Sequence, residues 1–134
     1  MTDDLVRFLR DRLDAEEHVA RAASPGPWHI NAEADEVLAA DGITVADGFA
    51  LSSQQLRATT EHIARHDPAR VLREVEAKRR IVDDYHYEST LPDGTALNEC
   101  GTCGAANDPW PCPTLRLLAL PYSGHADYRE DWRP

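Results

Sequence analysis

Three cysteines in the last third of the chain carry the clearest chemistry in this sequence. Cys100 and Cys103 are separated by two residues, and Cys112 lies nine positions beyond Cys103. A C-x2-C turn can direct both sulfur atoms at one ion, and thiolates are preferred ligands of zinc. Gly101 and Gly104 allow the positive φ and the close backbone approach that such a turn needs. The spacing therefore predicts a metal site with three thiolate ligands.

A tetrahedral zinc ion needs a fourth ligand, and two histidines lie at suitable distances along the chain. His86 precedes Cys100 by fourteen residues, at the expected end of a long helix, whereas His125 follows Cys112 by thirteen residues. A place on the core-facing side of that helix favours His86 over His125, and another oxygen or nitrogen donor is the remaining alternative. Four protein ligands leave no coordination position open for water, so the zinc is expected to be structural and not catalytic.

The cysteines have two other interpretations. They could be three free thiols in a reducing cytosol, or three cysteines and one histidine could hold an iron-sulfur cluster. A C-x2-C pair with a third cysteine nearby, inside a segment rich in Gly and Pro, is more typical of a zinc site, and nothing in the sequence selects iron. Zinc is therefore the expected metal.

Two other groups of residues could carry chemistry. His62 and His66 have the i,i+4 spacing that lets one helix face bind a metal, but they do not form the H-E-x-x-H motif of zinc hydrolases. Arg70, Arg73 and Arg80 lie in a stretch of five basic and two acidic residues, as a recognition helix would. A solvated helix surface is the favoured interpretation of both groups, because the histidines border the apolar stripe and the rest of the chain is acidic.

The composition limits the class of protein. The chain has 134 residues and a formal net charge of -10, from 24 acidic and 14 basic side chains. This balance argues against a protein that mainly grips a phosphate backbone, and it favours another protein as the partner over nucleic acid. No apolar run reaches the length of a membrane span, and the first residues lack the features of a signal peptide. We therefore expect a cytoplasmic protein with no membrane partner.

The first half of the chain predicts two helices with a small sheet between them. Apolar residues share one face over 2–23, and Thr2 is the expected N-cap of that helix. Short apolar runs over 28–49, with an Asp-Gly turn signal at 41–42, indicate two or three antiparallel strands. Helical periodicity returns over 53–66.

The second half predicts a long helix and a short one, joined by a loop. Asp67 and the proline after it are typical of an N-cap followed by the first helical residue. Residues 89–111 are rich in Gly, Pro, Asn and Asp and predict an irregular loop, which zinc would order. A short helix is expected over 113–120, followed by an irregular tail docked by aromatic side chains. The expected core-facing residues of the long helix are Val71, Leu72, Val75, Val82, Tyr85 and His86.

Together these elements predict an α+β fold in a single domain over residues 1–134. It would contain an N-terminal helix, a small antiparallel sheet, two central helices, and a C-terminal loop and short helix stapled by zinc. Within that domain, residues 86–125 would form the zinc-stabilised subregion.

Three strings in the sequence resemble those of a known family. They are PGPWH at 25–29, HIARHDPARVLREVEAKRRIV at 62–82 and PCPTLRLLALPY at 111–122. Over nearly its whole length the chain resembles a family of small actinobacterial proteins known as a domain of unknown function. The family pattern places a histidine at the end of the long helix and cysteines before the last helix, where His86 and the three cysteines stand here. The G-P-W start is also similar to small phage and mobile-element accessory proteins, which implies a role in phage or plasmid biology.

The family resemblance implies no activity, so the functional prediction depends on the residues. We expect a small zinc-binding protein that is not an enzyme and acts as an interaction or adaptor protein. The alternatives are a nucleic-acid-binding regulator that uses Arg70, Arg73 and Arg80, and a small zinc-dependent enzyme.

Overall fold

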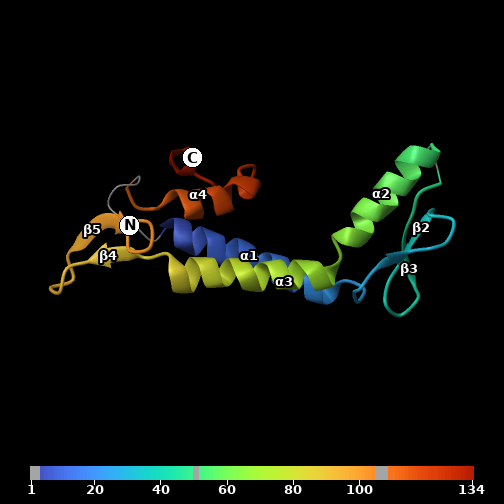
Figure 1. Ribbon diagram of the computed structural model, residues 1–134, viewed down its shortest axis with the longest axis horizontal. Coiled ribbons are helices and arrows are strands. Elements are labelled where there is room, and N and C mark those ends of the chain that lie inside the picture. Colours follow the sequence, from blue (N-terminus) through green and yellow to red (C-terminus); the bar gives the residue numbers. More distant parts are fainter. Residues whose placement is uncertain (1–3, 50–51, 105–108) are drawn as a thin grey trace. The chain divides into compact units, whose positions relative to one another are not determined.

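The computed structural model describes residues 4–49, 52–104 and 109–134 (Figure 1). Its strands form one three-stranded antiparallel sheet in the order β1-β2-β3 and one two-stranded antiparallel sheet, β4-β5. This architecture confirms the predicted α+β fold, while the expected N-cap Thr2 lies outside the described residues. In chain order the elements are α1 (Asp4–Ala22), β1 (His29–Ile30), β2 (Glu36–Leu38), β3 (Thr44–Asp47), α2 (Ser53–Arg65), α3 (Pro68–Arg80), a π-helix (Ile81–Tyr85), β4 (Glu88–Thr90), β5 (Ala96–Cys100), α4 (Pro113–Ala119) and two 3-10 helices (Leu120–Tyr122 and Glu130–Trp132).

The contacts between Cα atoms divide the chain into two compact units. Unit 1 contains Met1–Ala15 and Glu76–Pro134, and unit 2 contains Glu16–Val75. The predicted subregion 86–125 lies wholly in unit 1, and a single domain over 1–134 stays a prediction. Among the helices of the described residues, none combines the length and the apolar composition that crossing a bilayer requires.

In unit 2 the three-stranded sheet packs against α2. Val37 in the middle of β2 is fully buried, and Thr60 of α2 is 2% exposed. The Thr60 hydroxyl lies 3.1 Å from the carbonyl oxygen of Ala34, just before β2, and 2.9 Å from that of Leu56. Gly42 has a φ of 83° in the turn between β2 and β3, as the turn signal at 41–42 predicts.

Asp67 caps α3 and also anchors the segment before the sheet. Its Oδ1 accepts a hydrogen bond of 2.8 Å from the backbone N–H of Arg70, which confirms the predicted N-cap. Its Oδ2 accepts a second bond of 2.8 Å from the backbone N–H of Trp28. Only 6% of Asp67 is exposed. One buried carboxylate therefore joins two segments of unit 2.

We expect an Asp67→Ala substitution to lower the free energy of unfolding by about 2–3 kcal/mol, because two backbone N–H groups lose a charged acceptor. Urea denaturation followed by circular dichroism measures the loss. Ser52 is the matched control, since it precedes α2 but its side chain makes no capping hydrogen bond to the helix. Ser52→Ala should change stability by less than about 0.5 kcal/mol. Equal losses in the two variants would contradict the assigned role of Asp67.

The core of unit 1 lies between the first half of α1 and the C-terminal elements. Two ion pairs flank this core, Arg10 with Asp83 at 2.7 Å and Arg79 with Asp14 at 2.6 Å. The apolar stripe predicted for the first helix is thus buried in unit 1, with charged residues along its borders, whereas Val19 farther along the helix is 66% exposed. The buried residues are Leu5, Val6, Phe8, Leu9, Val82, Cys100, Trp110, Cys112, Leu115, Ala119 and Trp132.

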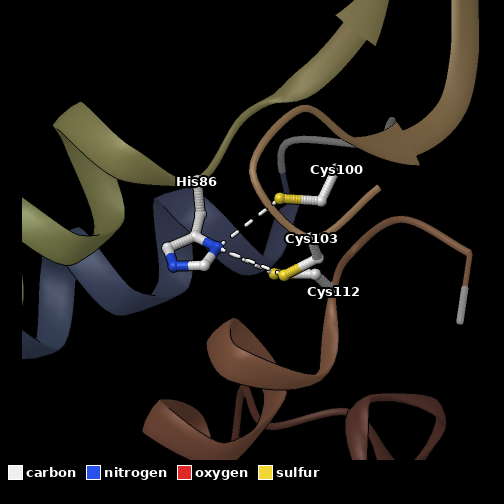
Figure 2. Close-up of side chains that lie close together, drawn as sticks. All are labelled: His86, Cys100, Cys103 and Cys112. Carbon is white, nitrogen blue, oxygen red and sulfur yellow. Dashed lines mark hydrogen bonds between the residues drawn. The ribbon is translucent and has the colours of Figure 1, made fainter. Parts of the chain in front are cut away.

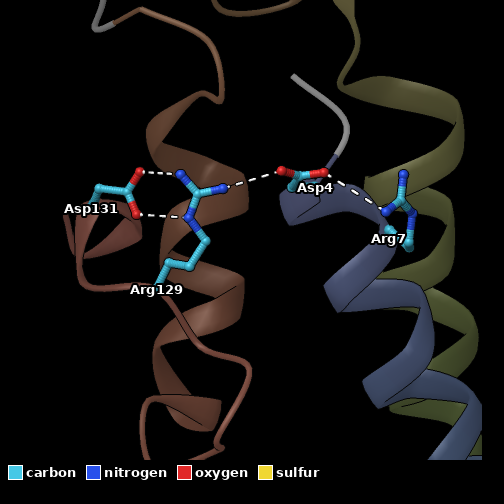
Figure 3. Close-up of polar contacts among 4 residues, drawn as sticks. All are labelled: Asp4, Arg7, Arg129 and Asp131. Atoms are coloured by element: carbon cyan, nitrogen blue, oxygen red, sulfur yellow. Dashed lines mark hydrogen bonds and ion pairs between the residues drawn. The ribbon is translucent and has the colours of Figure 1, made fainter. Parts of the chain in front are cut away.

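The C-terminal tail is held against the first turns of α1 (Figure 3). Arg129 pairs with both carboxylate oxygens of Asp131, at 2.7 and 3.1 Å, and donates to Asp4 at 3.1 Å. Arg7 lies on the other side of Asp4, at 3.8 Å. Trp132 is buried, with 5% of its surface exposed, as the expected aromatic docking requires.

The long central helix ends in a π-helical turn, which changes one predicted side-chain orientation. Uninterrupted α-helical periodicity places Tyr85 on the apolar face, but Tyr85 is 60% exposed, so this prediction is wrong. The wider turn over Ile81–Tyr85 adds a residue and rotates the following side chains away from the α-helical stripe. Val82 stays buried, and His86 leaves the helix in an extended conformation.

The segment predicted as an irregular loop contains a β-hairpin. Glu88 of β4 pairs with Cys100 of β5, and Thr90 pairs with Ala96. The turn between the strands contains Pro-Asp-Gly at 92–94, whose glycine has a φ of 89°. This string is a recognised turn signal, because proline presets one backbone angle and glycine accepts a positive φ. The prediction of an irregular loop, which began at residue 89, is therefore wrong for residues 89–100.

Candidate metal centre

Four side chains from three segments of unit 1 converge at one point (Figure 2). His86 follows the π-helix, Cys100 ends β5, Cys103 lies in the turn after β5, and Cys112 directly precedes α4. Their candidate ligand atoms all lie within 4.8 Å of one another. We call these four residues the Cys-His cluster. The structure thus brings together all four residues that the sequence predicts as metal ligands.

The spacing within the Cys-His cluster fits a tetrahedral zinc ion. The Nδ1 atom of His86 lies 3.4 Å from the Sγ of Cys112, 3.5 Å from that of Cys100 and 3.7 Å from that of Cys103. Zn–S bonds of about 2.3 Å and a Zn–N bond of about 2.0–2.1 Å, at a tetrahedral angle, place nitrogen and sulfur about 3.6 Å apart. Figure 2 shows Nδ1 turned toward the sulfur atoms. The cluster could therefore hold a metal ion such as zinc.

Burial separates the four donors into two pairs. Cys100 is 1% exposed and Cys112 is fully buried, whereas Cys103 and His86 are half-buried. Ionised thiols in a buried position are unfavourable unless a cation balances them. A bound divalent ion would balance the charge of the thiolates. It would also join the end of β5 to the start of α4.

The turn after β5 positions the two closest cysteines. The backbone N–H of Gly104 donates to the carbonyl oxygen of Cys100 at 2.8 Å, and Gly104 has a φ of 86°. Gly101 has no positive φ, but a Cβ atom there would overlap the ring of Tyr87. The two predicted roles of glycine, positive φ and close approach, are thus divided between Gly104 and Gly101. Thr102 completes the turn by donating its hydroxyl to the carbonyl oxygen of Tyr85.

The surroundings shift the acidity of two thiols in opposite directions. Burial opposes ionisation of Cys100, but the backbone N–H groups of Cys103 and Thr102, followed by the His86 ring, lower its pKa to about 6. Burial raises the pKa of Cys112 to about 12, and repulsion from the other two sulfur atoms adds to the rise. Cys112 therefore stays protonated at neutral pH unless a cation replaces its proton.

The competing ligand His125 lies elsewhere in unit 1. Its ring centroid is 5.7 Å from that of Phe8, and its Nε2 atom forms a hydrogen bond with Arg12. Within the described ranges, no other group of three or more His, Cys, Asp or Glu side chains is spaced to hold a metal ion. His86 is thus the histidine that faces the three sulfur atoms.

The two weaker sequence candidates have ordinary surface contacts. His62 and His66 are exposed, with ring centroids 4.3 Å apart, and Nδ1 of His66 lies 2.7 Å from the carbonyl oxygen of His62. Two of the three arginines of the basic stretch form i,i+4 ion pairs. These pairs are Arg70 with Glu74 at 2.8 Å and Arg80 with Glu76 at 3.6 Å.

Comparison with known proteins yields a family and no activity. No curated protein and no solved structure matches the chain. The model of a family of unknown function, DUF6221, matches residues 2–134 and so covers all three strings on which the resemblance depends. The chain is therefore a member of DUF6221, a family of unknown function.

Proposed function

We propose that this protein binds one structural zinc ion and acts by binding another protein. The observation that carries the zinc assignment is the convergence of one imidazole nitrogen and three sulfur atoms at tetrahedral spacing. When bound, zinc would neutralise the thiolates and link the end of the π-helix, the hairpin and the start of α4. The predicted cytoplasmic location would keep the cysteines reduced and available to the metal.

A structural role follows from the number of donors and from the elements they join. Four protein ligands complete a tetrahedral shell, so no position is left for a catalytic water. The β4-β5 sheet has only two strands, and an isolated two-stranded hairpin is marginally stable in water. Zinc bound by Cys100 and Cys112 would supply the folding free energy that this part of unit 1 needs.

The surface charges support a protein partner over the two alternatives. The net charge of -10 opposes binding to a phosphate backbone, and Arg70 and Arg80 are engaged by glutamates on their own helix. The exposed positions of His62 and His66 give no support to hydrolytic zinc chemistry. A link to phage or mobile elements stays a prediction from the resemblance.

Elemental analysis of protein purified without added metal tests the zinc assignment, and we expect one zinc per chain. After exchange for cobalt, the absorption spectrum should show tetrahedral coordination and sulfur-to-cobalt charge transfer, unchanged by added cyanide because the shell is closed. Less than about a tenth of an equivalent of zinc would overturn the assignment. A spectrum that changes with cyanide would show an open position and favour the enzyme.

A further inference from the structure

The β4-β5 hairpin exposes apolar side chains to solvent. Tyr87, Leu91 and Leu97 are 56%, 44% and 41% exposed, and Tyr85, just before the hairpin, is 60% exposed. Large apolar side chains that gather on one surface are typical of a site for another macromolecule.

The strand register places these side chains on one face of the hairpin. Glu88 lies opposite Cys100, and Thr90 lies opposite Ala96, so these even-numbered residues share a face. We call this the inner face because its Cys100 end is buried in the Cys-His cluster, while Thr90 and Ala96 at its other end are exposed. Alternation along β4 places Tyr87 and Leu91 on the opposite side. Leu97 directly follows Ala96, before the positive φ of Asn98 breaks the alternation of β5, and it therefore points to that side too. We call this side, with Tyr87, Leu91 and Leu97, the outer hairpin face.

The charged side chains of the segment that contains the outer hairpin face have a single sign. Residues 81–100 contain five acidic side chains and no lysine or arginine. Asp83 is engaged by Arg10 at 2.7 Å, whereas Asp84 and Asp93 are exposed. The apolar face is thus bordered by negative charge, which attracts a basic surface and repels an acidic one.

We propose that the outer hairpin face is a docking surface for a protein segment whose apolar side chains are flanked by lysine and arginine. This inference rests on the proposed function and names the surface and the chemistry of the partner. Contact with Tyr87, Leu91 and Leu97 supplies apolar burial, and the acidic border selects the basic segment. A second copy of the chain, with its own net charge of -10, is disfavoured at this face.

The zinc site and the docking surface are coupled through one strand. Cys100 is the last residue of β5, and its side chain lies on the face opposite Leu97. A metal bound to Cys100 holds the inner face of the hairpin against unit 1 and so preorganises the outer face. Preorganisation raises affinity because less conformational entropy is lost on binding.

The test uses the full, metal-loaded chain and a short amphipathic peptide made only of leucine and lysine. In proton–nitrogen NMR spectra, we expect peptide-induced shifts concentrated in residues 85–99. A Tyr87→Ser, Leu91→Ser, Leu97→Ser variant should bind at least about tenfold more weakly, and added salt should weaken binding to the unmodified chain. The same peptide with glutamate in place of lysine should not bind.

A matched variant removes exposed apolar side chains from unit 2 instead. Val19 and Ile43 are 66% and 61% exposed, so Val19→Ser with Ile43→Ser should leave the affinity unchanged. If the triple serine variant fails to fold, the milder Asp84→Asn, Glu99→Gln variant keeps the apolar face and should lose affinity several-fold. Four results would each overturn the inference. They are an unchanged affinity in the hairpin variants, peptide-induced shifts located in unit 2, binding of the glutamate peptide, and self-association of the chain through the hairpin.

Metal content separates this inference from the proposed zinc role. A chain that holds one zinc but does not bind the peptide refutes the docking surface and leaves the structural zinc intact. A chain without zinc that still binds the peptide at residues 85–99 refutes the structural zinc and leaves the docking surface intact.

Discussion

A Cys112→Ser substitution is expected to lower bound zinc from one equivalent to under about a tenth. Cys112 is fully buried and lies between β5 and α4, so its loss removes both a ligand and the link between two segments. The free energy of unfolding of unit 1 should fall by about 4 kcal/mol or more when free zinc is roughly a thousandfold above its Kd. Elemental analysis and guanidinium denaturation with and without zinc measure the two effects.

Two histidine variants identify the fourth ligand. His86→Ala should lose zinc as Cys112→Ser does, because Nδ1 of His86 faces all three sulfur atoms. His125→Ala should keep one zinc per chain, since that ring lies against Phe8 and Arg12. Loss of zinc in His125→Ala, with zinc retained in His86→Ala, would show that His125 is the fourth ligand.

Chelation provides a control that changes no residue. Removing zinc from the unmodified protein should reproduce the destabilisation of Cys112→Ser, and adding zinc back should restore only the unmodified chain. If Cys112→Ser were equally destabilised but retained a full equivalent of zinc, the loss would belong to core packing and the ligand assignment would be wrong.

Zinc affinity is expected to fall by at least about four orders of magnitude between about pH 8 and pH 5. Protons and zinc compete for the same sulfur atoms, so the affinity rises with pH. Cys112, with a pKa of about 12, must release one proton to bind zinc at every pH in this range. This proton changes the zinc affinity tenfold per pH unit. Cys100, with a pKa of about 6, is already ionised above that pH and contributes a second proton only below it.

Competition with a chelator whose own proton binding is known measures this dependence. The logarithm of the affinity should rise by at least about one per pH unit above pH 6 and by at least about two below it. A pH-stat titration should also detect at least about one proton released per zinc at pH 8. An affinity that does not change with pH would show that the thiols are not the ligands.

The convergence of Cys100 and Cys103 could be predicted because their geometry is local. Cys100 and Cys103 are joined by a short turn, so their sulfur atoms converge wherever the rest of the chain lies. The choice of histidine is different, because His86 and His125 lie at nearly equal separations from the nearest cysteine along the chain. Packing of the C-terminal tail against Phe8 places His125 away from the sulfur atoms.

The hairpin at 88–100 has a turn sequence that predicts a hairpin, but its strands lack the pattern that predicts a strand. Its Pro-Asp-Gly turn is recognisable, but the strands do not alternate cleanly in polarity. The register shifts between Glu88 and Thr90, and Asn98 has a positive φ of 55°. Such irregular pairing breaks the period of two by which strands are recognised. The π-helical turn could not be predicted either, because the apolar periodicity before Tyr85 is that of an ordinary α-helix.

The amino-acid sequence by itself determined the features that depend on neighbours within a turn or two of chain. These are the helices, the glycine turn at 42, the Asp67 cap and the thiol donors of the candidate metal site. Only the tertiary structure decided that His86 faces the sulfur atoms, that Asp67 also accepts from Trp28, and that one hairpin face is left exposed. The physical reason is that these features arise from packing between distant segments, which no local pattern of residues specifies.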